Sequence, residues 1–202
     1  MPDPHSSRVY KFKEVLNDLI SYFLLGDLIS LKNYKDLHHL PDDLATEFTT
    51  YESGDNAVKE GILIPLAGIE NYPYTIIFNL SGETPELLKT DSELQIRESG
   101  YILKIESETL HLFTWRALNN FKESTIEEFT QNKPHISLEN GWYTLEILGG
   151  QTLQDSIINE KGENLIIRES EPTLEFILSK TKEKKECTAD IFRSYTLKSN
   201  SY

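Results

Sequence analysis

The stretch SLENGWYTLEILGGQ (residues 137–151) decides how this chain is expected to fold. Its apolar residues alternate with polar ones, as they do in a β-strand that buries one face. The side chains expected to face inward are Tyr143, Leu145 and Ile147. The opposite face would carry Trp142, Thr144 and Glu146. A large aromatic side chain is therefore expected among polar neighbours on the outer face.

A two-residue turn is expected at Asn140-Gly141, because this dipeptide is a strong signal for a hairpin between antiparallel strands. With the turn there, Leu138 would lie opposite Tyr143, and Ile136 opposite Leu145. The turn chemistry and the apolar pattern agree on this register, which supports a hairpin over residues 135–146.

Helical spacing of apolar residues predicts a first helix over residues 7–25, ended by Gly26. A second helix is expected over 27–40, before Pro41, and a third over 114–133 with a break near Ser124.

The remaining segments are expected to be extended. Strands are predicted over 45–53, 73–81, 108–115, 172–181 and 188–197, with an edge strand or loop over 61–69. Further hairpins are predicted over 92–107, turning at Ser99-Gly100, and over 156–170, turning at Lys161-Gly162, with a bulge or bend at Gly149-Gly150. The string Tyr-x-Leu-x-Ile occurs at 101–105 and again at 143–147, too short a repeat to indicate duplication.

These elements predict an α+β fold: a mostly antiparallel sheet built from hairpins, with an N-terminal helix and a mid-chain helix packed on it. Residues 1–202 would form a single domain. Within it we expect a helical segment at about 7–40, a β-rich body at about 46–180 and a charged tail at 180–202.

The net charge of the chain indicates which classes of partner it is expected to bind. The chain has 33 acidic and 20 basic residues, a formal net charge of -13. This charge repels nucleic acid and anionic lipid, and favours a protein partner with a basic surface. An alternative interpretation is that the charge only keeps the protein soluble. The chain start has no signal-peptide pattern, and LISYFLL and GILIPLAGI are much shorter than the roughly 20 residues that span a bilayer. We expect a cytoplasmic protein that binds neither nucleic acid nor membrane.

The outer face of the 135–146 hairpin is the predicted binding site. Its members are His135, Ser137, Glu139, Trp142, Thr144 and Glu146. Two interpretations stay open. The strip is a recognition surface around an exposed indole, or a helix covers it and Trp142 packs beneath. His135 opposite Glu146 could form an acid–base pair, but such pairs also stabilise ordinary sheets.

Other reactive side chains offer weaker signals. A metal site at Asp36, His38, His39, Asp42 and Asp43 is not expected, because adjacent histidines on a helix point about 100° apart. His111 is expected to be buried and hydrogen-bonded, and Cys187 to be an incidental thiol. The sequence contains no phosphate loop, nucleophile elbow or paired cysteine motif, so we expect no cofactor, no metal and no enzyme.

The sequence therefore favours a non-enzymatic, acidic protein-binding module, such as an inhibitor or immunity-type protein for a basic partner. One alternative is a small-ligand binder or enzyme with a pocket around Trp142, His135 and Glu146. The other is a homo-oligomeric structural subunit that associates through a free strand edge. The oligomeric state is left open.

Overall fold

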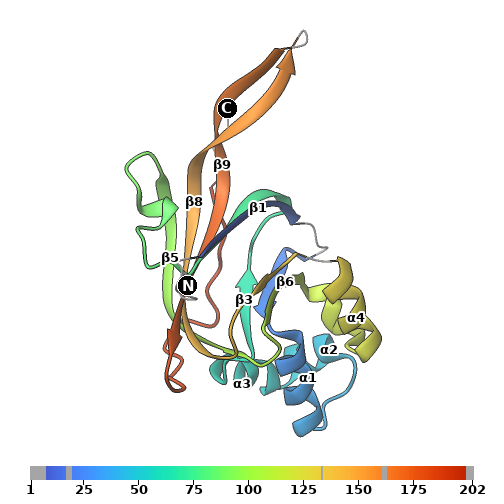
Figure 1. Ribbon diagram of the computed structural model, residues 1–202. Coiled ribbons are helices and arrows are strands. Elements are labelled where there is room, and N and C mark those ends of the chain that lie inside the picture. Colours follow the sequence, from blue (N-terminus) through green and yellow to red (C-terminus); the bar gives the residue numbers. More distant parts are fainter. Residues whose placement is uncertain (1–7, 17–19, 133, 161–162, 199–202) are drawn as a thin grey trace, which may run out of the picture.

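Two β-sheets and a group of helices form three layers in the computed structural model, which describes residues 8–16, 20–132, 134–160 and 163–198 (Figure 1). For 156–160 and 163–165 it describes the backbone alone. The five-stranded large sheet has the order β1 (Val9–Leu16), β4 (Tyr72–Asn79), β9 (Glu163–Thr181), β8 (Gly141–Glu160) and β5 (Glu93–Ile105). The four-stranded small sheet has the order β3 (Leu63–Ala67), β2 (Tyr22–Gly26), β6 (Thr109–Thr114) and β7 (His135–Ser137).

The helices lie on the side of the small sheet away from β8 and β9 (Figure 1). They are α1 (Leu28–Leu37), α2 (Leu44–Thr50), α3 (Ser53–Lys59) and α4 (Glu123–Asn132), with the short 3-10 helix η2 (Trp115–Asn120). The other short 3-10 helix, η1 (Glu86–Leu88), instead contacts the large sheet at β5, β8 and β9. Among the described strands every pair is antiparallel except β4 with β9. The expected α+β fold with a mostly antiparallel sheet is confirmed.

The small sheet is the middle layer. Successive residues of a strand point to opposite faces, and both Leu24 and Leu25 of β2 are fully buried. One face therefore packs on the large sheet and the other on the helices, where Phe113 of β6 meets Phe129 of α4 edge to face. Burial of apolar side chains on both faces of this sheet therefore stabilises the fold through the hydrophobic effect.

The predicted helix over 7–25 is wrong, because this segment forms β1 and β2. Alternate residues of β1 turn towards the core, where Phe12 stacks on Phe78 of β4. Apolar residues at 9, 12 and 16 fit a helix equally well, so the pairing with β4 decides the structure.

The predicted strand over 45–53 is also wrong. Residues Leu44–Thr50 form α2, whose first turn is capped by Asp43: its carboxylate accepts hydrogen bonds from the Thr46 amide at 3.0 Å and the Thr46 hydroxyl at 2.7 Å. Such a cap satisfies amides that a helix start otherwise leaves without partners.

The hairpin predicted around Asn140-Gly141 is wrong in its strand pairing, but the prediction of which side chains face inward is confirmed. β7 pairs with β6 in the small sheet, whereas β8 pairs with β5 and β9 in the large sheet. Residues 138–140 thus connect the two sheets instead of closing a hairpin. The predicted inward residues are nevertheless all buried: Ile136, Leu138, Tyr143, Leu145 and Ile147.

The turn predicted at Ser99-Gly100 does not exist, since β5 runs through it with a register shift between Glu98 and Tyr101. Gly100 takes a left-handed backbone conformation there, with φ 95°. β8 likewise continues through Gly149-Gly150, and the irregularity lies opposite, on β5 between Leu94 and Ile96. The extra residue therefore sits on the partner strand.

Other predicted elements are confirmed. The second helix is α1, and the third is present as η2 and α4 with a break between them. β3, which contains Pro65, lies at the edge of the small sheet as its proline requires. β4, β6 and β9 also form as expected. The hairpin of 156–170 is present, although its turn residues Lys161 and Gly162 lie outside the described residues.

The ends of β8 and β9 extend beyond the large sheet as a two-stranded ribbon, called here the arm (residues 152–160 and 163–172). β5 pairs with β8 as far as Gln151, and β4 pairs with β9 from Thr173 onward. In the described part of the chain, the arm strands pair only with each other. Figure 1 shows the arm projecting well away from the two sheets.

The tail of the chain (residues 182–198) is not the predicted strand, and pairs with a strand only through one parallel bridge between Ala67 and Ser194. It crosses between the two sheets: the Thr188 amide donates to the Gly100 carbonyl at 2.9 Å, and the Tyr195 amide to the Ala67 carbonyl at 2.7 Å. The tail therefore ties an edge of the large sheet, β5, to an edge of the small sheet, β3.

Candidate functional site

The predicted binding residues are divided between the two sheets. Trp142, Thr144 and Glu146 lie on the outer face of the large sheet, while His135 and Ser137 lie on β7 in the small sheet. Glu139 lies in the connection and forms an ion pair with Lys180 at 2.5 Å. The structure therefore does not bring the six residues together as one strip.

Trp142 is half-buried. The Lys184 amine lies over the indole, 5.5 Å from the ring centroid, and Gly61 approaches so closely that an added Cβ would lie 3.1 Å from the ring. Thr144, further along β8, donates a long hydrogen bond of 3.4 Å to the Ser179 carbonyl. The indole thus has contacts of its own in the fold, and a portion of it remains accessible to a partner.

The proposed acid–base pair between His135 and Glu146 does not form. Glu146 accepts a hydrogen bond from Nε of Arg97 at 2.6 Å, across the large sheet. His135 lies opposite His111 of β6, with ring centroids 5.3 Å apart. Glu146 therefore does not orient the His135 imidazole in the way that general acid–base catalysis would need.

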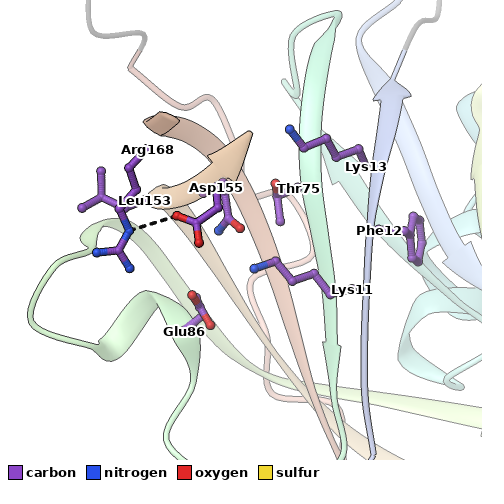
Figure 2. A pocket seen from close by; sticks show the side chains of 9 residues that line it. Lys11, Phe12, Lys13, Thr75, Glu86, Leu153, Asp155 and Arg168 are labelled. Atoms are coloured by element: carbon purple, nitrogen blue, oxygen red, sulfur yellow. Dashed lines mark ion pairs between the residues drawn. The ribbon is translucent and has the colours of Figure 1, made fainter. Parts of the chain in front are cut away.

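A hollow of about 380 Å³ lies at the base of the arm, and sequence reasoning did not find it (Figure 2). Lys11 and Lys13 of β1 form one wall, and their amines extend towards the arm (Figure 2). Asp155 and Arg168 form the other wall as an ion pair at 3.3 Å, and Glu86 of η1 lies below. The hollow is thus bordered by charges of both signs.

Hydrogen bonds between buried hydroxyls and an amide form the base of the arm beside this hollow. Thr152 and Thr173 share a hydrogen bond of 2.6 Å, and the Gln154 amide donates to the Thr152 hydroxyl at 2.5 Å. Glu171 accepts from the Thr75 hydroxyl at 3.0 Å and pairs with the Lys13 amine at 2.5 Å. These contacts fix the position from which the arm leaves the large sheet.

Two buried carboxylates have structural tasks. Glu175 accepts hydrogen bonds from the Asn79 amide group and from the backbone amides of Glu86 and Leu87, and so holds η1 on the outer face of the large sheet. Asp27 caps α1 and also accepts from the amides of Glu106 and Ser107. These backbone and side-chain donors hold both carboxylates in place within the fold.

The cluster at the end of α1 is occupied by ordinary contacts, in agreement with a solvated helix end. Asp36 pairs with Lys32 at 2.7 Å, Asp42 pairs with Lys35, and the His38 ring lies 4.4 Å from the Tyr34 ring. The ion pairs hold the pKa of both carboxyl groups below their ordinary value. Within the described residues, no three His, Cys, Asp or Glu side chains are placed to hold a metal ion together.

His111 is buried as expected, but neither of its ring nitrogens has a hydrogen-bond partner among the described residues. Burial and the neighbouring His135 lower the pKa of His111 to about 4, against an opposing pull from the Asp27 carboxylate. Burial is the larger cause, because it removes water from the charged form. The hydrogen bond predicted for this residue is therefore absent from the described part of the structure.

No helix in the described residues combines the length and the apolar content that crossing a membrane requires.

Comparison with known proteins gives a distant likeness of fold. No protein-family model and no curated protein matches the sequence. A solved structure described as crocagin biosynthetic gene J is similar, with 10% identity over 85% of this chain and 97% of that one and a TM-score of 0.43. ComJ from Bacillus subtilis, described as an inhibitor of the DNA-degrading activity of NucA, has 11% identity over 87% of this chain and 98% of its own, with a TM-score of 0.41. A likeness at this level carries no argument about what this chain binds.

Proposed function

We propose that this chain is a non-enzymatic protein-binding module, of the inhibitor or immunity type, that docks a basic protein partner through the arm and the hollow at its base. The observation that carries the proposal is the arm itself. Its strands leave the large sheet at Gln151 and Thr173 and continue as a ribbon of two strands.

A two-stranded ribbon is at best marginally stable in water, because it has little apolar surface to bury against itself. Ordering these residues also costs conformational entropy. A partner that packs on the ribbon, or pairs with one of its edges, would supply the missing burial and hydrogen bonds.

The composition of the arm indicates the chemistry of that partner. Residues 152–172 contain five acidic and two basic residues, so they repeat the negative balance of the whole chain. They also contain Ile157, Ile158, Leu165, Ile166 and Ile167. Ile166 is 73% exposed. A partner with a basic rim and an apolar patch would match this combination, and opposite charge would speed its association.

The hollow suits a contact rather than a reaction. Its lining consists of Lys11, Phe12, Lys13, Thr75, Glu86, Leu153, Gln154, Asp155 and Arg168. This set includes no histidine, cysteine or serine, and the Thr75 hydroxyl already donates to Glu171. Amines, carboxylates and an amide around an open hollow can instead pair with side chains of a docking protein.

The experiment compares three forms of the tagged chain as bait in lysate of the native source: unaltered, Ile166→Ser on the arm, and Leu37→Ser on α1. Leu37 is 75% exposed and Ile166 73%, so the two variants remove similar apolar surface at different places. We expect one basic protein to be retained by the unaltered chain and by Leu37→Ser, and lost with Ile166→Ser. Equal retention by all three would show that the arm is not the docking element.

The captured protein, once purified, then tests the role of charge. Its association rate with this chain should fall as ionic strength rises from about 0.05 M to 0.5 M, because salt screens the attraction between separated charges. A rate that does not respond to salt would contradict a basic partner. Sedimentation of the chain alone would reveal arm-dependent self-association, the outcome expected of a homo-oligomeric subunit instead.

A further inference from the structure

His111 and His135 form a cross-strand pair that the proposed function does not use. His111 is 2% exposed, and both of its ring nitrogens lack a hydrogen-bond partner among the described residues. Buried polar groups are nearly always satisfied, so an orphaned imidazole calls for water, an ion or a role of its own.

The two imidazoles point to the same face of the small sheet. His111 and His135 are directly opposite in the register of β6 and β7, and directly paired residues share a face. Phe113, two residues further along β6, contacts α4, so this face is the one turned towards the helices. The rings are tilted by 39°, with their centroids 5.3 Å apart.

This separation matches chelation of one ion. Two imidazoles that bind zinc at about 2.0–2.1 Å, with a tetrahedral angle between them, have ring centres about 5 Å apart. Imidazole nitrogen is a preferred ligand of zinc and of the neighbouring divalent transition metals. The path to the site is short, because β7 is an edge strand and His135 is exposed.

We propose that His111 and His135 together bind one divalent transition-metal ion of the zinc class, with water completing the coordination. The ion would bridge the inner and edge strands of the small sheet, and would satisfy a nitrogen of His111. Occupancy would therefore fix β7, which pairs with only three residues of β6, against its neighbour.

The protonation state of His111 suits this role. Only a neutral imidazole binds a metal, and the lowered pKa of His111, about 4, keeps that ring neutral at physiological pH. The Asp27 carboxylate acts in the opposite direction, towards protonation, but it is saturated by backbone and hydroxyl donors.

The test uses zinc sulfate as the probe and a background variant in which His5, His38 and His39 are replaced by glutamine. The chain has 5 histidines, so this background retains only the pair. Zinc is titrated after treatment with EDTA, while the two remaining histidine ring signals are followed by NMR and the heat by calorimetry. We expect one ion per chain and a shift of both ring signals.

Replacement of the exposed member, His135→Ala, should weaken zinc binding by about tenfold or more, since even residues that only support a metal ligand contribute 10–100-fold. Zinc should also raise the thermal midpoint of the background variant but not that of His135→Ala, because a ligand stabilises only the form that binds it. Equal affinity of the two variants, or zinc that moves the His135 signal without that of His111, would overturn the proposal.

Discussion

The Tyr195 hydroxyl donates a hydrogen bond to the Tyr101 hydroxyl, 3.0 Å away, and both side chains are fully buried. Tyr101 in turn donates to the Asp190 carbonyl at 3.1 Å. This short chain of hydrogen bonds connects the tail to β5. Burial raises the pKa of Tyr101 to about 12 and raises that of Tyr195 as well, so both remain protonated donors.

The two tyrosines should differ in what their hydroxyls contribute. Tyr101→Phe leaves the buried Tyr195 hydroxyl and the Asp190 carbonyl without partners, and should lower the free energy of unfolding by about 2–3 kcal/mol. Tyr195→Phe leaves Tyr101 still donating to Asp190, and should cost about 1 kcal/mol. Urea denaturation measures both. Equal costs would show that the hydrogen bonds do not run in the direction described.

Two helix caps provide a comparison between a buried and an exposed carboxylate. Asp43→Ala removes only the cap of α2 and should cost about 1 kcal/mol. Asp27→Ala removes the cap of α1 and also leaves the amides of Glu106 and Ser107 without an acceptor, so it should cost about 3 kcal/mol or more. Thermal or urea unfolding of the two variants checks this difference. Similar losses would contradict a role for Asp27 in joining α1 to the turn before β6.

Stability should fall in mild acid because of His111. Its pKa is about 6.5 in an unfolded chain and about 4 in the folded one, so the unfolded state binds the proton more readily. The folded state is therefore unaffected above pH 6.5 and loses stability as the pH falls towards 4. At pH 5 the loss is about 2 kcal/mol, from the shift of the two pKa values.

The measurement is urea denaturation at pH 7.5 and at pH 5 in the presence of EDTA. Replacing the side chain, in His111→Leu, should remove about 2 kcal/mol of the difference between the two pH values, while carboxylates account for what remains. His39→Leu, at an exposed position, serves as the control. If the free energy of unfolding of His111→Leu depended on pH as that of the unaltered chain does, protonation of His111 would not destabilise the folded state.

Hydrogen exchange should divide β8 into two parts. Amides in 141–151 lie between β5 and β9, whereas those in 153–160 pair with β9 alone in the described structure. Local opening of the arm needs no disruption of the core, so its amides should exchange about tenfold faster or more. Mass spectrometry of peptides from the two halves tests this. Equal protection in the isolated chain would mean that something else stabilises the arm.

The sequence predicted the buried faces of strands better than their partners. The two Tyr-x-Leu-x-Ile strings, at 101–105 and 143–147, both point into the core, and they prove to be direct neighbours: Tyr101 lies opposite Leu145, and Leu103 opposite Tyr143. Alternation is a local property and can be predicted from the chain alone. Pairing between segments some forty residues apart depends on the three-dimensional arrangement, which that pattern does not contain.

The same limit explains what was missed at the site. Asn140-Gly141 is a reliable hairpin signal, but here Gly141, with φ 144°, begins β8, and the Asn140 side chain accepts from the Glu108 amide at 2.8 Å. The hollow is built from β1, β4, η1, β8 and β9, so no contiguous stretch of sequence describes it. The sequence predicted the hairpin of 156–170 but not its continuity with the strands on either side. Its extension past the sheet depends on where β4 and β5 stop pairing.

The arm is a continuation of β8 and β9, which lie in the interior of the large sheet and not at its margin. A partner that binds the arm is therefore connected to the interior of the large sheet through the continuous backbone pairing of β8 with β9. A partner bound to the arm is therefore expected to restrict motion in the interior of the large sheet as well as in the arm itself.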